Sequence, residues 1–122
     1  MARITGVGGI FFKAADPKAL AAWYRDVMGI GVEDWGGALF SPDKQGPPHL
    51  VWSPFRQDTD YFAPSAREFM INFCVDDLDG MIAALKGKGV EIIGRDDSDP
   101  NGSFAWLLDP AGTKIELWQT KR

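Results

Sequence analysis

One pattern of predicted secondary structure occurs twice in this chain, and it restricts the fold more than any other feature of the sequence. Each copy begins with a strand-like stretch, continues into an amphipathic helix and ends with three short strand candidates. The two copies are separated by roughly 60 residues, and a repeat of this length is a property of the whole fold. The first copy contains "VGGIFFKAA", "DPKALAAWYRDVMG", "IGVEDW", "GALFS" and "HLVWSPF", and the second contains "FMINFCV", "DDLDGMIAALKGKG", "VEIIG", "SFAWLL" and "TKIELWQ".

The helix of each copy has recognisable ends and one apolar face. In the first copy Asp16 suits the N-cap, Pro17 suits the first helical position and Gly29 suits the exit. Apolar residues then recur at spacings of three and four, which is the period of a helix that packs on a sheet. This predicts packed side chains at Leu20, Trp23, Tyr24 and Val27 in the first helix and at Leu78, Met81, Ile82 and Leu85 in the second.

Length and composition exclude several classes of protein. A chain of 122 residues makes one domain, which we divide into a first module (about 4–55), a linker (56–67) and a second module (68–119). The net charge of −4 disfavours nucleic acid and anionic membranes as partners. The early apolar stretch "ITGVGGIFF" is interrupted by glycines and does not resemble a signal peptide. The only cysteine is Cys74, so no internal disulfide is possible, and we expect a cytoplasmic protein.

Alternation along the strands separates a purely apolar face from a mixed face in each module. The apolar faces suit packing beneath the helices. If the mixed faces curve together, they line a cleft with aromatic walls and a few polar groups, which is the general form of a small-molecule site. The alternative is that they are the solvated side of an antiparallel sheet, which would leave large aromatic side chains exposed. The mixed faces carry Phe11, Lys13, Met70, Asn72, Cys74, Trp106, Lys114, Glu116 and Trp118.

Three segments make the sequence similar to a known superfamily. They are "GIFFKAADPKALAAWYRDVMGI", "FMINFCVDDLDGMIAAL" and the closing "FAWLLDPAGTKIELWQ", in which a D-P-x-G turn leads into an I-E-L strand. With these segments the chain resembles the vicinal oxygen chelate superfamily, which includes glyoxalase I, bleomycin-resistance proteins and extradiol dioxygenases. The resemblance implies an α+β fold in which two βαβββ modules form a U-shaped, mostly antiparallel sheet around a cleft. It also implies frequent homodimers and, in the metalloenzymes, one divalent metal per site.

The metal-ligand positions that this resemblance implies are mostly not filled by ligands here. Carried over residue by residue, they fall at Gly9, Leu50, Met70 and Glu116, where Leu50 is found by aligning "HLVW" with "IELW". Glycine and leucine have no donor atom, and a thioether suits soft ions rather than magnesium, manganese, nickel or zinc. His49 is the only histidine, but alternation places it on the face opposite Leu50. We therefore expect no metal and no other cofactor.

Glu116 then needs another explanation, and two remain open. One is an ion pair with Lys13, since a carboxylate that faces an aromatic cleft needs compensation. The other is a free carboxylate that accepts a proton in catalysis or binds a cationic or hydroxylated ligand. Trp52 and Trp118 correspond in the repeat and are the best tryptophan candidates for stacking on a flat ligand, with packing in the core as the alternative for each. The linker is either a simple crossover or a lid of the cleft.

The sequence therefore predicts a protein that binds a small organic ligand without metal, with or without turnover. The expected ligand-binding residues are Phe11, Lys13, Leu50, Trp52, Met70, Asn72, Trp106 and Trp118, with Glu116 as the candidate catalytic residue. The alternative is a metal-dependent, glyoxalase-like lyase or isomerase, or a dioxygenase, with Glu116 and His49 as ligands. A purely structural module is a third possibility. We expect a homodimer.

Overall fold

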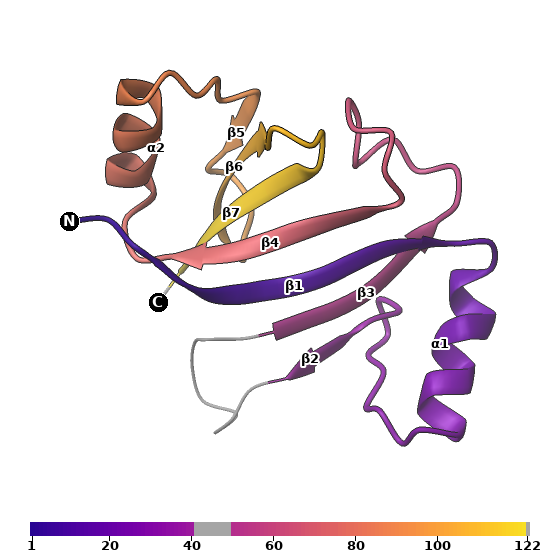
Figure 1. The fold of residues 1–122 in the computed structure, drawn as a ribbon. Helices are drawn as coiled ribbons and strands as arrows, with labels where there is room; N and C mark the ends of the chain where they lie inside the picture. Colours follow the sequence, from indigo (N-terminus) through magenta and orange to yellow (C-terminus); the bar gives the residue numbers. More distant parts are fainter. Residues whose placement is uncertain (41–49, 122) are drawn as a thin grey trace.

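A computed structural model describes residues 1–40 and 50–121, and in this part of the chain one mixed sheet of seven strands carries two helices (Figure 1). The first half contains β1 (Ile4–Ala14), α1 (Pro17–Asp26), β2 (Ala38–Phe40) and β3 (Leu50–Arg56). The second half contains β4 (Phe69–Val75), α2 (Leu78–Gly87), β5 (Gly94–Asp96), β6 (Gly102–Leu108) and β7 (Lys114–Thr120).

The two modules join edge to edge at the centre of the sheet. The strand order is β2-β3-β1-β4-β7-β6-β5. β1 and β4, the first strands of the two modules, pair antiparallel, and each pairs in parallel with the last strand of its own module, β3 or β7. The remaining pairs are antiparallel. The α+β fold class and the mostly antiparallel sheet predicted from the sequence are thus confirmed.

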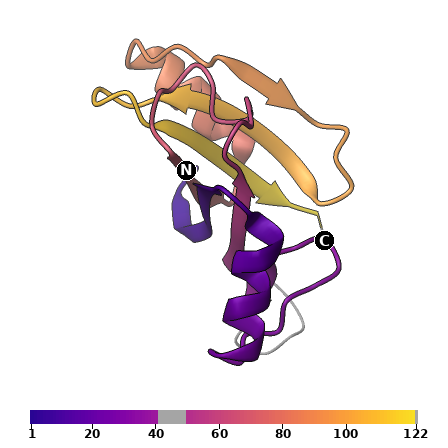
Figure 2. The ribbon, with the colours of Figure 1, turned by 90° about the vertical axis from the view of Figure 1, so that its right-hand side faces the viewer.

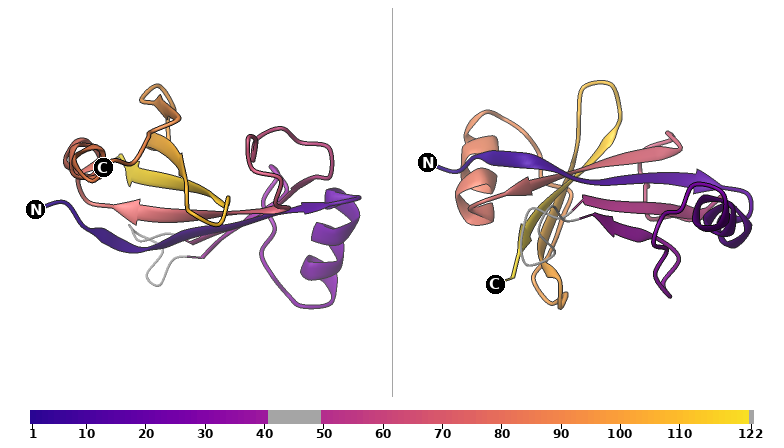
Figure 3. Two further views of the ribbon diagram at one scale, coloured as in Figure 1. Left: turned by 45° about the horizontal axis from the view of Figure 1, so that its top comes forward. Right: turned by 90° about the horizontal axis from the view of Figure 1, so that it is seen from below.

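The sheet is strongly twisted, and the helices lie at opposite ends of it. Two views show that β6 and β7 run at a steep angle to β1 and β3 (Figures 2 and 3). The strand sterics that give sheets their right-handed twist account for this curvature. The segment between β3 and β4 rises above the sheet on the side where β6 and β7 lie (Figure 3). This segment, residues 57–68, is called the crossover below.

Both helix starts follow the sequence prediction. The side chains of Asp16 and Asp77 each accept a hydrogen bond from a backbone N–H three residues on, at 3.1 Å. These bonds satisfy donors that a helix start leaves unpaired. α2 packs as predicted: Leu78 and Ile82 are buried against β6 and β7, with Met81 and Leu85 beside them.

Two expectations for the first module are wrong. Trp23 and Val27 are not packed but 49% and 62% exposed, because α1 is held on the sheet by the smaller Ala21 and by Tyr24 instead. The predicted strand at residues 30–35 does not form. Its apolar residues Ile30 and Val32 pack beneath α1 from an irregular segment that makes only local hydrogen bonds, such as Glu33 N–H to Gly37 O.

Packing divides between the two faces of the sheet. On the helix side, one cluster lies under α2 and another under α1. On the other side, Phe11, Phe62 and Met70 form a third buried cluster, which the crossover closes with Phe62. None of the helices in residues 1–40 and 50–121 has the length and apolar composition needed to cross a membrane.

Candidate functional site

Strand register determines which side chains share the face opposite the helices. Phe11 of β1 lies beside Ser53 of β3 on one side and beside Met70 of β4 on the other. Asn72 of β4 lies beside Glu116 of β7. Because neighbouring residues in register point to the same side of a sheet, these side chains form one surface. We call it the cleft face.

Leu50 and Trp52 do not belong to the cleft face, which corrects the sequence prediction for both. The register pairs Gly9 with Val51, so Val51, Ser53 and Phe55 face the cleft and the residues between them face α1. Trp52 is buried against Phe12 and Tyr24, with ring centroids 5.7 and 4.7 Å away. The alignment on Trp118 misled because the two tryptophans occupy different environments: one fills the core under α1, and the other lines the cleft.

Glu116 points into the cleft and is held there by three neutral donors. Its side chain is buried, with 2% of its surface exposed. Oε2 accepts hydrogen bonds from Tyr61 Oη at 2.5 Å and Trp106 Nε1 at 2.7 Å. Oε1 accepts one from Asn72 Nδ2 at 2.6 Å. Bonds to a charged acceptor are short and strong, and they compensate for the loss of water around the carboxylate.

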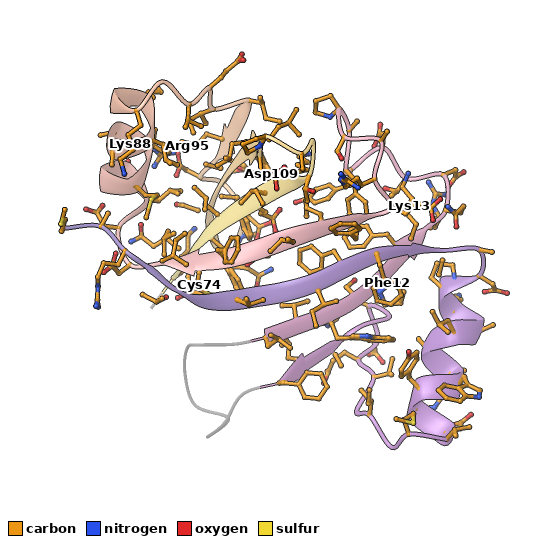
Figure 4. All side chains as sticks on the ribbon, viewed as in Figure 1. Phe12, Lys13, Cys74, Lys88, Arg95 and Asp109 are labelled. Atoms are coloured by element: carbon orange, nitrogen blue, oxygen red, sulfur yellow. The ribbon has the colours of Figure 1, made fainter. Side chains whose placement is uncertain are left out.

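The expected ion pair between Glu116 and Lys13 does not form. Within the described residues, neither oxygen of Glu116 has a lysine, arginine or histidine nitrogen within 4.0 Å. Lys13 and Phe12 extend to opposite sides of β1 (Figure 4), and the backbone N–H of Lys13 bonds Glu68 O of the crossover. The carboxylate is stabilised by hydrogen bonds rather than by an opposite charge.

Tyr61 is a site residue that the sequence prediction did not select. It lies in the crossover, 55 residues from Glu116 in sequence. Its ring stacks on Phe55 at 5.5 Å, and its backbone oxygen accepts a hydrogen bond from Lys114 Nζ at 2.6 Å. The crossover is therefore part of the site. Burial, and then the negative charge of Glu116, raise the pKa of the Tyr61 hydroxyl, so this group remains a donor.

Lys114 is buried beside Tyr61 and Trp106. Its ammonium group lies 5.2 Å from the Tyr61 ring centroid and 5.5 Å from that of Trp106, within cation–π distance. Burial lowers the pKa of Lys114, and the nearby charge of Glu116 opposes this shift. Its hydrogen bond to Tyr61 O ties the crossover to β7.

The cleft face borders a cavity of about 600 Å³. Two parallel aromatic rings form one wall, Phe104 and Trp118, with centroids 5.9 Å apart. Trp106 lies parallel to Phe104 at 6.3 Å but is not among the residues that line the cavity. Trp106 itself contributes its indole N–H to Glu116, while Met70 is covered by Phe11 and Phe62 and does not reach the cavity. The lining residues include Phe11, Trp35, Leu39, Ser53, Phe55, Tyr61, Asn72, Asn101, Phe104, Glu116, Trp118, Thr120 and Lys121.

Two further cleft-face residues support this arrangement. Gly8 lies at a bulge of β1, where a Cβ would collide with Asn72 Oδ1 and lie 2.9 Å from Cys74 Sγ. Only glycine leaves room for the Asn72 side chain in its present position. Cys74 is buried, and burial raises the pKa of its thiol, which keeps it in the less reactive protonated form.

The described residues do not fit the divalent metal that the superfamily resemblance implies. At Gly9, carbons of the Phe11 ring lie 2.7 Å from the place where a Cβ would be, so a ligand side chain there would collide with that ring. Met70 is enclosed by apolar groups, and both oxygens of Glu116 already face N–H or O–H donors. In the described part of the chain, no three histidine, cysteine or acidic side chains cluster as a metal would require. His49 lies outside the described residues.

Comparison with known proteins identifies the family. A model of the glyoxalase-like domain matches residues 9–118. The chain belongs to this glyoxalase-like family of the vicinal oxygen chelate superfamily, which confirms the resemblance seen in the sequence. No curated protein gives a significant match.

Solved structures with the same fold include methylmalonyl-CoA epimerases. Methylmalonyl-CoA epimerase from Mycobacterium tuberculosis superposes with a TM-score of 0.67 at 20% identity, covering 98% of this chain and 90% of the epimerase chain. A variant of the Streptomyces coelicolor epimerase in complex with 2-nitronate-propionyl-CoA gives 0.67 at 20% identity, with coverage of 98% and 100%. A hypothetical protein from Bacillus halodurans C-125 gives 0.65 at 13% identity, with coverage of 99% and 96%. At these identities the likeness shows the fold alone.

Replacement of Gly8 by alanine tests whether this glycine is needed to position Asn72. The new methyl group would displace Asn72, Cys74 or Trp118, and overpacking of this kind costs about 1–3 kcal/mol of unfolding free energy. Gly6→Ala is the matched control, because a Cβ at this position of β1 meets nothing within 4 Å. Urea denaturation measures both variants. Equal midpoints for the two variants would contradict the assigned role of Gly8.

The raised pKa of Tyr61 predicts a specific loss of stability in alkali. An unfolded chain ionises tyrosine near pH 10, whereas the folded protein keeps the Tyr61 proton. The contribution of neutral Tyr61 to the unfolding free energy is complete below about pH 10. Above that pH it decreases by up to about 1.4 kcal/mol per pH unit. We expect the unfolding free energy of the wild type to fall more steeply above pH 10 than that of Tyr61→Phe. Parallel curves would show that Tyr61 is not held neutral.

Proposed function

We propose that this protein binds a small, flat organic ligand in the cleft and that binding requires no metal. The observation that carries the proposal is the cavity itself, which joins aromatic walls to a floor with a buried carboxylate and an amide. Its volume of about 600 Å³ lies within the range of small-molecule sites. Aromatic walls favour stacking, while the few polar groups orient the ligand.

Protein side chains occupy the positions where the superfamily resemblance implies metal ligands, and this supports binding without metal. Phe11, Phe62 and Met70 pack where the superfamily resemblance puts ligand groups, and Glu116 is engaged by three donors. A ligand in this cleft is held by protein groups alone, either for sequestration or for turnover. If the protein is an enzyme, Glu116 is our candidate proton acceptor, because its Oε1 accepts only one hydrogen bond from the described residues.

A homodimer is the assembly we propose, and the sheet offers a surface for it. On the face opposite the cleft, four apolar side chains of β1 and β4 are between 43% and 51% exposed: Ile4, Val7, Ile10 and Phe69. Apolar surface of this kind favours association, and a two-fold arrangement would bury it twice. The cytoplasmic location expected from the sequence is part of the same proposal.

Trp35 provides the test of ligand binding. It lines the cavity and is 53% exposed, so its replacement removes one lining side chain without leaving a void in the hydrophobic core. A panel of flat aromatic compounds with positive, neutral and negative members is screened by thermal shift, since a ligand raises the melting temperature of the state it binds. We expect hits, and we expect Trp35→Ala to weaken them about three- to tenfold, the range for one aromatic contact.

Trp23→Ala is the matched control for this experiment. Trp23 is a tryptophan of similar exposure, 49%, but it lies on α1 and does not line the cavity. Its replacement should leave the affinities unchanged. A panel without hits, or hits that both variants weaken equally, would contradict binding in the cleft.

A further inference from the structure

The negative charge at the cavity floor has no counter-ion among the described residues. All three groups bonded to Glu116 are neutral: a hydroxyl, an indole N–H and an amide N–H. Lys114 is the nearest candidate, but its ammonium group is engaged with Tyr61 O and with the rings of Tyr61 and Trp106. It forms no ion pair with Glu116 within 4.0 Å. The charge of Lys114 acts on Glu116 from a longer distance, but no cation among the described residues contacts the carboxylate.

Asn72 adds an unpaired acceptor beside this charge. Its Nδ2 bonds Glu116, so its Oδ1 points to the other side of the amide. Oδ1 is buried and, among the described residues, is the side-chain polar atom for which no hydrogen-bond partner is found. A buried acceptor without a partner is unfavourable and becomes favourable when a donor reaches it. Oδ1 is turned toward Gly8 of β1, however, and is fully buried, so the acceptor that the floor offers to a ligand is Oε1 of Glu116, which accepts one hydrogen bond from the described residues.

The aromatic walls of the cavity favour a positively charged ligand. Phe11, Phe55, Phe104 and Trp118 line the cavity together with Tyr61. The face of an aromatic ring is negative and attracts cations, and this attraction strengthens where water is excluded. An anion placed against these rings would meet both their faces and the charge of Glu116. In the described part of the lining the positive side chain is Lys121, which is exposed.

We propose that the ligand of this cleft is an organic cation, a flat ring system that carries a protonated amine, with the amine at Glu116 and the ring against the aromatic wall. This inference rests on the proposed function and specifies the class of ligand. The ammonium group supplies both a further hydrogen-bond donor for Oε1 and a positive charge in direct contact with the carboxylate. The stack of Phe104 and Trp118 supplies the surface for the ring.

Three indole compounds that differ in charge test the inference. Tryptamine is a cation at neutral pH, indole-3-ethanol is neutral and indole-3-acetate is an anion, while all three share one ring system. Isothermal titration calorimetry gives their dissociation constants. We expect tryptamine to bind at least about tenfold more tightly than indole-3-ethanol, since hydrogen bonds between charged groups are stronger than those of a neutral hydroxyl. We expect indole-3-acetate to bind most weakly.

Glu116→Gln assigns the preference to this carboxylate. Glutamine can keep its oxygen toward Tyr61 and Trp106, and Asn72 can turn its amide so that Oδ1 accepts from the new N–H₂ group. The variant should therefore fold, and tryptamine should bind it about as weakly as indole-3-ethanol. Glu91→Gln is the control, because it makes the same change of charge at an exposed residue outside the cavity.

The outcomes separate this inference from the proposed function. Tighter binding of indole-3-acetate, or a preference for tryptamine that survives in Glu116→Gln, would overturn the inference while the cleft remained a binding site. Equal loss of the preference in Glu91→Gln would overturn it too, because long-range charge would then be the cause. If none of the three compounds binds, the inference fails, and the proposed function fails with it only when the wider panel also gives no hits.

Discussion

The arrangement of the cleft depends on one buried carboxylate that three neutral groups hold. Glu116 comes from β7, its donors come from β4, β6 and the crossover, and the carboxylate brings these parts of the chain together. A bare carboxylate at this depth would be strongly unfavourable, so the donors and the acid require each other. The donors are also what separates this cleft from a metal site, because they take up the positions around the oxygens that an ion would need.

Apolar side chains occupy the remaining positions where metal ligands would be expected. Phe11 lies where a ligand side chain at residue 9 would be, and Met70 lies beneath Phe62 of the crossover. The fold of the glyoxalase-like family is retained while its centre is divided between an apolar cluster and a polar floor. This division leaves the open part of the cavity with aromatic walls and an acidic end, which is the basis of the ligand class proposed above.

Local sequence signals predicted the modules, and long-range contacts decided the site. Asp16 and Asp77 cap helices because the required atoms lie three residues apart, so the sequence alone contains that information. Tyr61 meets Glu116 only because the crossover folds back over the sheet, and no short-range pattern indicates this. The register of β3 could not be obtained from the repeat either, because Trp52 and Trp118 match in sequence while packing in different surroundings.

Glu116 is held by hydrogen-bond donors and not by a cation. A crystal structure of the protein grown with nickel, zinc or manganese tests this most directly. We expect Tyr61 Oη, Asn72 Nδ2 and Trp106 Nε1 within hydrogen-bond distance of the carboxylate and no ion bound to it. An ion at full occupancy on Glu116, with other protein atoms completing its coordination, would contradict the account.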